Sequence, residues 1–288
     1  MKQVLKTLLP YLINNKFVFN LSGKLSSYIN QLTYKSLSKE SIRDLIFLMQ
    51  PHHAAREDLL RIGNENDGGY VIYSKVSPAN TFLISLGVGS DITFDLSMND
   101  KVQHSILVDH TVKSLPSPLN NATFINKKIS PFAGIKSLTL FDCINMVPRD
   151  ADIVLKIDIE GSEWDVLDQI DTKNLNRFTQ IIGEFHDFHE IYSRSHYAKV
   201  MRVLTKLNKT HVNINFHPNN WSSYRVVYGL TIPDVIEFTF LRNDIYKLSE
   251  VSPPSRTNCS FDQSLNSPNN PQLFDYPTCL FSSTFLRV

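Results

Sequence analysis

The sequence has few of the features that mark secreted, membrane and nucleic-acid-binding proteins. Three cysteines in 288 residues are too few for the disulfide framework of a small secreted domain, although Cys259 and Cys279 could pair. No stretch reaches the roughly 18 apolar residues of a membrane helix, and residues 1–20 lack a cleavage site after an apolar core. A net charge of +1 creates no field that attracts DNA, RNA or anionic lipid.

These absences narrow the expected partners and location. We expect a cytoplasmic protein without an integral membrane segment and without a nucleic-acid partner, and we leave a homo-oligomer open. The composition, 42% hydrophobic and 20% charged, is that of an ordinary globular protein. The length suits one large α/β domain with a short extra segment, or two small domains.

Three regions of the chain differ in pattern. Residues 1–60 are polar-rich and predict a helical extension, in which Ser41-x-x-Asp44 resembles a capping box and Pro51 ends the last helix. Residues 61–250 alternate short apolar runs with helical segments and predict the main domain. Residues 251–288 are rich in Pro, Asn and Ser, which predicts an irregular tail.

The middle region has the pattern of a doubly wound sheet. Its apolar runs suit strands buried on both faces: Phe82–Leu86, Ser105–Val108, Ile153–Ile159 and Gln180–Phe185. The segments between them predict helices: Ile92–Asn99, Leu138–Met146, Glu163–Ile170 and Tyr197–Leu207. Two later strands, Val212–Phe216 and Val235–Leu241, are joined by a long loop. This alternation predicts an α/β fold with a mostly parallel sheet.

A glycine turn follows the first of these strands. Gly87 and Gly89 stand between a strand and a helix, where glycines let the backbone approach a nucleotide and the helix offers free N–H donors. Asp109 ends the next strand about twenty residues on, where a carboxylate holds ribose hydroxyls. The dinucleotide fingerprint needs a small third residue at the position of Ile92, so we prefer S-adenosylmethionine to an NAD-type ligand.

Several motifs resemble the FkbM-type methyltransferases. They are Asp67-Gly68-Gly69-Tyr70-Val71, Leu86-Gly87-Val88-Gly89, Asp109, Thr139-Leu140-Phe141-Asp142, Leu155-Lys156-Ile157-Asp158-Ile159-Glu160-Gly161-Ser162-Glu163, His217-Pro218-Asn219-Asn220 and Ile232-Pro233-Asp234-Val235-Ile236-Glu237. The resemblance extends from about residue 60 to 245. The segment around Asp158 is its most specific part. Phe141 departs from the usual family pattern, which has Asp-Asp before this helix, but Asp142 is retained.

The resemblance implies a seven-stranded Rossmann-like methyltransferase sheet and transfer of a methyl group from S-adenosylmethionine to oxygen, frequently on sugars. We assign nine residues to cofactor binding: Asp67, Gly68, Tyr70, Gly87, Gly89, Asp91, Asp109, Asp142 and Lys156. Asp142 is expected near the adenine. The Gly68-Gly69 pair predicts a hairpin turn, a flap over the cofactor, or both.

Ionisable side chains gather at the expected carboxyl ends of the strands. They are Asp158, Glu160, Glu184, His186, Asp187 and His217, with Asn219 and Asn220 beside the last. Such groups need partners or a function when they are buried. One possibility is Mg²⁺ or Mn²⁺ held by Asp158, Glu184 and His217; the other is a metal-free histidine base. The candidate catalytic residues are therefore His217, Asp158 and His186.

Other polar residues have plainer interpretations. Asn219, Asn220 and Trp221 are candidate substrate contacts, with Trp221 able to stack on a sugar ring. Glu160 and Glu163 suit the start of a helix regardless of function. Three histidines in polar contexts, His189, His196 and His211, are expected at the surface, and Trp164 is expected in the core.

The sequence therefore favours an O-methyltransferase of a sugar or glycoconjugate hydroxyl, with a divalent metal as a possible assistant. An O-methyltransferase of a non-sugar molecule, such as a polyketide or a phosphate-type oxygen, is the enzymatic alternative. A cofactor-binding module without chemistry is the non-enzymatic one.

Overall fold

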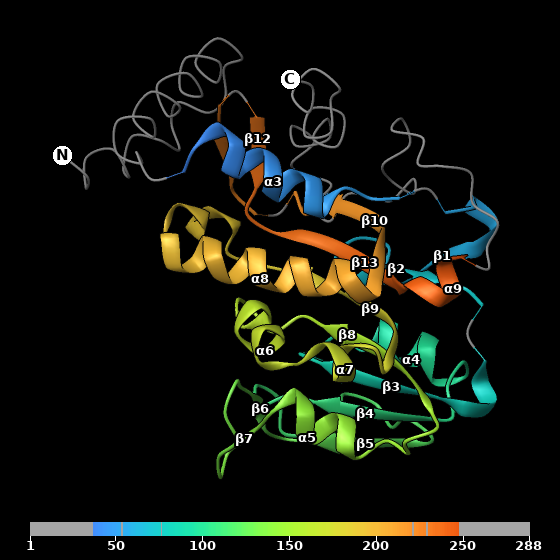
Figure 1. The fold of residues 1–288 in the computed structure, drawn as a ribbon. Coiled ribbons are helices and arrows are strands. Elements are labelled where there is room, and N and C mark those ends of the chain that lie inside the picture. The colour runs from blue at the N-terminus through green and yellow to red at the C-terminus, as the bar shows by residue number, and fades with distance from the viewer. Residues whose placement is uncertain (1–36, 53, 76, 221, 229, 248–288) are drawn as a thin grey trace.

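The computed structural model describes residues 37–247 except positions 53, 76, 221 and 229. The first 36 residues of the helical extension and the entire expected tail therefore lie outside the described residues. So do Trp221, Cys259 and Cys279. Figure 1 shows the described chain as a central sheet covered by helices.

The central sheet has seven strands in the order β10-β13-β9-β8-β3-β4-β5. Their bounds are β3 (Thr81–Leu86), β4 (His104–Val108), β5 (Ala122–Ile125), β8 (Asp152–Ile157), β9 (Phe178–Phe185), β10 (His211–Pro218) and β13 (Ile236–Arg242). Strands β9, β8, β3, β4 and β5 are paired in parallel, and β13 pairs antiparallel with both β9 and β10. The mostly parallel Rossmann-like prediction is confirmed. The short strand β5, only four residues long, was not predicted.

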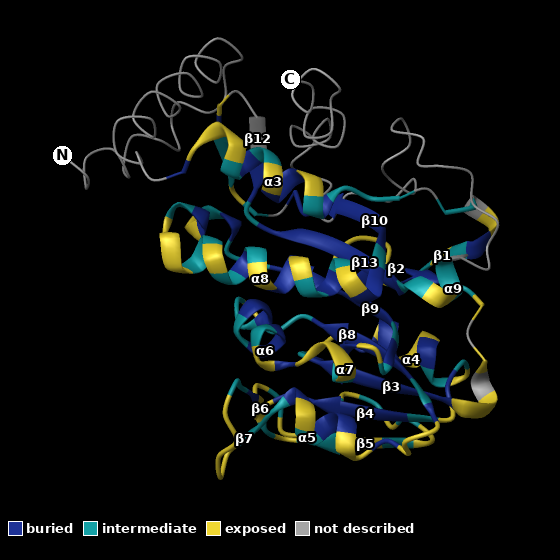
Figure 2. Cartoon of the chain, in the orientation of Figure 1, coloured by how far each residue is buried: buried dark blue, intermediate teal, exposed yellow. Residues whose placement is uncertain are grey.

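Helices pack on both faces of this sheet. The larger hydrophobic cluster joins one face to α3 (Lys39–Met49), α5 (Leu140–Asn145), α6 (Glu163–Gln169) and α8 (Arg194–Thr210). The short helix α7 (Thr172–Leu175) follows α6, and α9 (Asn243–Lys247) follows the last strand. On the opposite face lie α4 (Thr93–Asn99) and a two-stranded hairpin, whose apolar side chains form a second cluster with Leu83, Val154 and Ile182. Figure 2 shows the strands buried between these layers.

The hairpin on the second face consists of β1 (Leu59–Gly63) and β2 (Gly69–Tyr73). Gly63 and Gly68 have φ of 95° and 80°, values that side chains rarely adopt. The turn therefore needs glycine at these positions, which agrees with the predicted hairpin. Thr239 Oγ1 donates to the carbonyl of Val71 at 2.6 Å and fixes the hairpin on β13.

Helix α3 is the described part of the N-terminal extension, and it packs into the main core. Leu45, Ile46 and Met49 are fully buried there. The helix begins earlier than predicted, because Ser38 rather than Ser41 is its N-cap and accepts from the backbone N–H of Ser41. The division of the chain near residue 60 thus separates segments that share one hydrophobic core.

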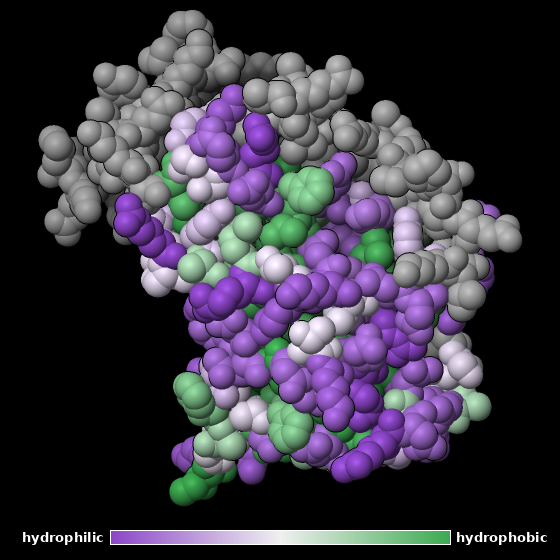
Figure 3. Space-filling model, viewed as in Figure 1, coloured by the Kyte–Doolittle hydropathy of each residue, from purple (hydrophilic) through white to green (hydrophobic). Residues whose placement is uncertain are grey.

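The remaining short elements lie in the connections. They are η1 (Arg56–Asp58), η2 (Pro78–Asn80), η3 (Phe188–Tyr192), the strands β6 (Lys128–Ile129) and β7 (Ser137–Leu138), and the hairpin β11 (Tyr224–Val227) with β12 (Leu230–Pro233). Hydrophobic atoms at the tip of the loop between β6 and β7 are visible at the lower left of Figure 3, in agreement with the exposed Phe132 and Ile135. Within the described residues, no helix has the length and apolar character that a membrane crossing requires.

Candidate functional site

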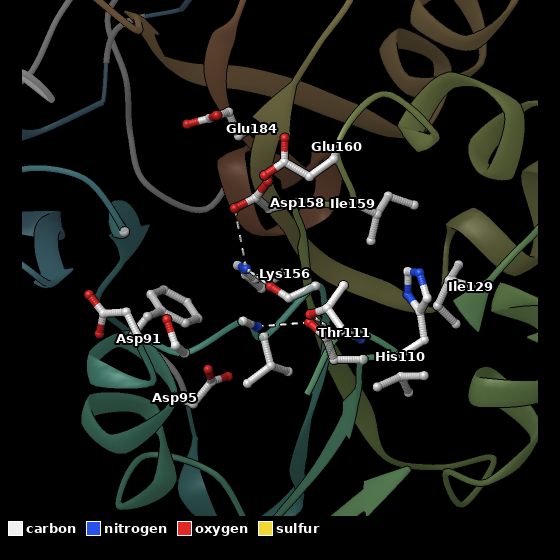
Figure 4. Close-up of a pocket in the computed structure, with 18 of the residues that line it drawn as sticks. Asp91, Asp95, His110, Thr111, Ile129, Lys156, Asp158, Ile159, Glu160 and Glu184 are labelled. Carbon is white, nitrogen blue, oxygen red and sulfur yellow. Dashed lines mark hydrogen bonds and ion pairs between the residues drawn. The ribbon is translucent and has the colours of Figure 1, made fainter. Parts of the chain in front are cut away.

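A pocket of about 420 Å³ opens at the carboxyl ends of β3, β4 and β8, beneath the β1–β2 turn. Its lining combines eight of the nine residues assigned to cofactor binding with Asp158, Glu160 and Glu184. Asp67, Gly68 and Tyr70 come from the hairpin, which therefore borders the pocket; its function as a flap over the cofactor stays a prediction. Figure 4 shows the lining side chains around this pocket, with Asp158, Glu160 and Glu184 close together on one side and Asp91 and Asp95 on another.

The glycine turn forms the floor of the pocket. Gly87 and Gly89 have φ of 77° and 61°. A Cβ on Gly87 would lie 1.5 Å from the carbonyl oxygen of Asp158, whereas a Cβ on Gly89 would meet nothing within 4 Å. Gly87 is therefore required by the close approach of β8, and Gly89 faces open space.

Asp109 ties the end of β4 to the glycine turn. Its Oδ2 accepts from the backbone N–H of Gly89 at 2.7 Å, and its Oδ1 accepts from the N–H and hydroxyl of Thr111. Burial alone would raise the pKa of Asp109, but these hydrogen bonds outweigh it and hold the pKa below its usual range. The carboxylate is thus ionised and fixed in place.

Lys156 and Tyr70 hold Asp158 from two sides. Tyr70 Oη donates to Asp158 Oδ2 at 2.8 Å, and Lys156 Nζ lies 3.6 Å from the same oxygen. Lys156 also donates to the carbonyl of Gly87, and its ammonium lies 5.5 Å from the centre of the Tyr70 ring. Burial, followed by the negative charge of Asp158, raises the pKa of Tyr70 well above its usual value, so Tyr70 stays protonated as a donor.

Asp158, Glu184 and His186 come together at the edge of the pocket. One ligand atom from each lies within 4.8 Å of the others, a spacing that suits a metal ion. His186 Nε2 is 3.1 Å from Glu184 Oε1, and Asn219 Nδ2 donates to Glu184 Oε2 at 2.8 Å. Burial raises the pKa of Glu184 above its usual value, although the hydrogen bond from His186 opposes this shift.

His186 is surrounded by carboxylates. Besides Glu184, its Nδ1 is 3.2 Å from the fully buried Glu163, and its Nε2 is 3.5 Å from Glu160. Burial alone would lower the pKa of His186, but the hydrogen bonds and charges of Glu163 and Glu184 raise it to about 11. In this arrangement His186 is an imidazolium that donates hydrogen bonds, and not the free base of the metal-free hypothesis.

His217 is not among the three residues of this group, and its expected role as a metal ligand stays a prediction. His217 pairs with Glu237 on β13, and Glu237 pairs with Glu184 on β9. The antiparallel strand β13 therefore stands between His217 and Glu184, at about 4.8 Å per strand. The sequence showed that each residue ends a strand, but not that β13 separates the two strands.

Other expected site residues have mixed outcomes. Asp142 does not line the pocket; its carboxylate accepts from the N–H and hydroxyl of Thr139 in a capping box, so its adenine contact stays a prediction. Asn219 and Asn220 are buried, and the Asn219 amide is used to hold Glu184. Trp164 is fully buried as expected, and its Nε1 donates to the carbonyl of His186.

Two site residues were missed or undervalued. Glu163 was interpreted as a helix-start carboxylate, but it accepts from the N–H groups of Ile159 and Gly161 and contacts His186. Asp95 was not considered, although it is buried and lines the pocket. Its position one helical turn after Asp91 was the only signal in the sequence. The surface prediction for His211 was wrong, since His211 is 1% exposed at the start of β10.

A family model described as the methyltransferase FkbM domain matches residues 76–211. No curated protein matches the chain.

Solved structures with a similar arrangement have low identity. A dimethyladenosine transferase from Plasmodium falciparum is 12% identical, with a TM-score of 0.33, and the match covers 61% of this chain and 60% of that one. SMU.1697c from Streptococcus mutans, solved in complex with SAH, is 12% identical (TM-score 0.32; 58% and 90% covered). The N-methyltransferase NodS from Bradyrhizobium japonicum WM9 is 10% identical (TM-score 0.30; 57% and 87% covered).

Proposed function

The chain carries a methyltransferase domain of the FkbM family at residues 76–211, and we propose that this S-adenosylmethionine-dependent enzyme methylates a hydroxyl of a sugar or glycoconjugate. One observation carries the proposal: Asp158, Glu184 and His186 meet beside the pocket that the glycine turn and Asp109 form. Methyl transfer to a hydroxyl requires a base that takes the hydroxyl proton. The three side chains lie at the edge of the cofactor pocket, where such a base is needed.

The lining of the pocket fits S-adenosylmethionine. The open face of Gly89 leaves room for a ligand against the backbone, and the ionised Asp109 accepts hydrogen bonds from ribose hydroxyls. Lys156, Asp91 and the hairpin residues Asp67 and Tyr70 would hold the other end of the molecule. When bound, the cofactor supplies an electrophilic methyl group on a sulfonium leaving group.

Within this arrangement the chain's own residues orient the acceptor and remove its proton. Glu184 lines the pocket, and its carboxylate is positioned by Asn219 on one oxygen and by His186 on the other. We assign Glu184 as the proton acceptor. Asp158, held by Tyr70 and Lys156, orients the acceptor hydroxyl, since in-line positioning supplies much of the rate of such reactions.

The charge of the pocket favours a neutral polyhydroxyl acceptor. Seven carboxylates line it: Asp67, Asp91, Asp95, Asp109, Asp158, Glu160 and Glu184. Three lysines oppose them: Lys127, Lys128 and Lys156. An excess of four negative charges repels a phosphate-bearing acceptor, such as a nucleic acid or a phosphate-type oxygen. Carboxylates also accept hydrogen bonds from sugar hydroxyls.

A divalent metal at the same group is the second mechanism that the geometry allows. Asp158, Glu184 and His186 would hold it, with His186 neutral, and oxygen-rich ligation favours Mg²⁺ or Mn²⁺. It would lower the pKa of a bound hydroxyl and so reduce the need for a base. His186 takes the place that we expected for His217.

Incubation with methyl-labelled S-adenosylmethionine tests the proposal. The acceptor panel should include neutral saccharides, sugar phosphates and RNA, each with EDTA or with Mn²⁺. We expect label on a saccharide oxygen. Label only on RNA or on nitrogen would contradict the sugar hydroxyl, and activity that EDTA abolishes and Mn²⁺ restores would select the metal mechanism. A homo-oligomer and a cytoplasmic location stay predictions.

A further inference from the structure

We propose that the loop between β6 and β7 docks the protein on an anionic lipid surface. This loop consists of residues 130–136, and we call it the apolar loop. The inference goes beyond the proposed methyl transfer, because docking on lipid requires neither the cofactor nor the acceptor.

The apolar loop exposes two large hydrophobic side chains. Ile135 is 95% exposed and Phe132 is 72% exposed, the two highest values among the large hydrophobic residues that the structure describes. Single exposed hydrophobic residues are common on protein surfaces. Here, however, two of them share one projecting loop, whose hydrophobic tip is visible in Figure 3. Exposed apolar side chains that gather in this way are typical of an interaction site.

The backbone of the apolar loop is held by hydrogen bonds. Gly134 and Ser137 exchange two backbone hydrogen bonds of 3.2 Å, and the N–H of Ser130 donates to the carbonyl of Leu138 at 2.9 Å. The hydroxyl of Ser137 donates to the carbonyl of Phe132 at 3.1 Å. The loop therefore has a defined conformation, and this conformation presents both apolar side chains to the outside instead of folding them onto the sheet.

The segment that contains the apolar loop is basic. Residues 110–141 include four lysines and no aspartate or glutamate, although the whole chain has a net charge of only +1. Three of the lysines are exposed: Lys113, Lys128 and Lys136. Asn126 donates to the carbonyl of Val112 and so holds the first of them beside β6. Because a charged surface acts over roughly 8 Å at physiological ionic strength, this local charge decides the interaction and not the net charge of the chain.

This combination fits an anionic membrane better than it fits a protein or RNA. A protein partner usually covers a broad surface, whereas the apolar loop is a narrow projection (Figure 1). RNA could contact the lysines and stack on Phe132, but it would gain little from Ile135, the more exposed of the two. A lipid surface uses every part, since apolar side chains enter the interface and lysines attract the anionic headgroups.

The apolar loop lies at the edge of the sheet where the pocket opens. Strand β5 runs parallel to β4, so the segment that follows β5 continues from the same edge. Lys128 and Ile129, directly before the loop, line the pocket. Docking would therefore hold the pocket near the lipid surface, where a sugar carried by a lipid is within reach. This consequence rests on the proposed function, but the docking does not.

Sedimentation of the full chain with phospholipid vesicles tests the docking. Vesicles of phosphatidylcholine alone are compared with vesicles that also contain phosphatidylserine. We expect binding to the anionic vesicles that weakens as salt is added, and little binding to the neutral ones. Phe132→Ala combined with Ile135→Ala should weaken this binding roughly 10-fold or more. Lys113→Gln combined with Lys136→Gln should weaken it roughly 10- to 30-fold.

Phe47→Ala combined with Leu96→Ala is the matched control. These two side chains are also large, hydrophobic and exposed, but they lie on α3 and α4, so the control should bind vesicles like the wild type. None of the six substituted side chains lines the pocket. Affinity for S-adenosylhomocysteine and the melting temperature therefore check that each variant is folded.

Four results would overturn the docking: no binding to anionic vesicles, equal binding to both kinds of vesicle, undiminished binding without Phe132 and Ile135, or an equal loss in the control. A wild type that binds no vesicles but self-associates through the apolar loop would assign the loop to an interface between copies of this chain. A chain that binds anionic vesicles but not S-adenosylhomocysteine would refute the proposed cofactor and leave the docking intact.

Discussion

A histidine lies against each end of strand β9, His186 directly after the strand and His211 of β10 beside its first residue, and the two are held in opposite charge states. At the carboxyl end, carboxylates surround His186, and Glu163 and Glu184 raise its pKa to about 11 against the effect of burial. At the other end, His211 contacts the carbonyl of Phe178 and the hydroxyl of Thr210, and burial lowers its pKa to about 4.

The difference in charge state distinguishes a histidine in a functional site from one that only fills space in the core. A neutral histidine satisfied by one carbonyl and one hydroxyl is a stable way to fill the end of a sheet. An imidazolium among several carboxylates removes charged groups from water, which costs desolvation free energy. Such clusters of charge are typical of functional sites. These charges meet at the edge of the sheet where the pocket opens. Substitutions at and around the two ends of β9 test this contrast.

The largest effect is expected at the carboxyl end. Glu184→Gln removes the proton acceptor but keeps a side chain that can contact Asn219, so methyl transfer should fall roughly 10²- to 10⁴-fold. Affinity for S-adenosylhomocysteine should stay within about threefold. Steady-state rates with titration of the ligand measure both. Glu190→Gln is the control, because Glu190 is a half-exposed glutamate outside the pocket lining. An equal loss of the transfer rate in Glu190→Gln would show that Glu184 is not the proton acceptor.

The glycine turn next to this end gives a matched pair of stability variants. Gly87→Ala places a Cβ 1.5 Å from the Asp158 carbonyl and should destabilise the fold by about 3 kcal/mol or more. Gly89→Ala meets no atom and should cost about 1–2 kcal/mol for its positive φ. Urea unfolding measures both. Equal losses would show that β8 does not approach Gly87 as described.

The opposite end should produce a pH dependence. The folded pKa of His211 lies below its unfolded value of about 6.5, so its contribution is fully present above pH 6.5. Stability is lost as the pH falls towards about 4, because the unfolded chain binds the proton first, and the loss reaches about 3 kcal/mol at most. His211→Gln should flatten this slope in urea unfolding at several pH values. An unchanged slope would mean that other groups cause it.

The smallest effect is expected for an ion pair exposed to solvent. Arg202 bonds to Asp168 at 2.6 Å and is 56% exposed. Because water screens such a pair, Arg202→Ala should change stability by no more than about 0.5–1 kcal/mol. Thermal melting at low and high salt measures this change. A loss of stability as large as that of Gly87→Ala would show that exposed ion pairs matter as much as the buried contacts around β9.

The sequence predicted the parts of this molecule that depend on local pattern. Apolar runs located six of the seven sheet strands, because buried strands need them. The glycine turn and Asp109 were also predicted from the sequence, because a positive φ favours glycine and because Asp109 directly follows an apolar run. Strand β5 was missed because four residues, none of them fully buried, give little signal.

The sequence did not predict which strand ends become neighbours. Strand β13 lies between the strands that carry His217 and Glu184. This strand order is a property of the whole sheet, and the local pattern of a single strand does not reveal it. The burial of His211 and Asp95 was hidden for the same reason. A polar residue in a polar segment is buried only because a distant element covers it, as the segment at Phe178 does for His211.

We expect methyl transfer to depend on His186 and its carboxylates and not on His217. The most direct measurement compares the rate of labelled methyl transfer by His186→Gln and His217→Gln, with S-adenosylhomocysteine affinity confirmed for both. We expect a fall of at least roughly 10²-fold for His186→Gln and less than about fivefold for His217→Gln. A larger fall for His217→Gln at unchanged cofactor affinity would show instead that the reaction depends on His217.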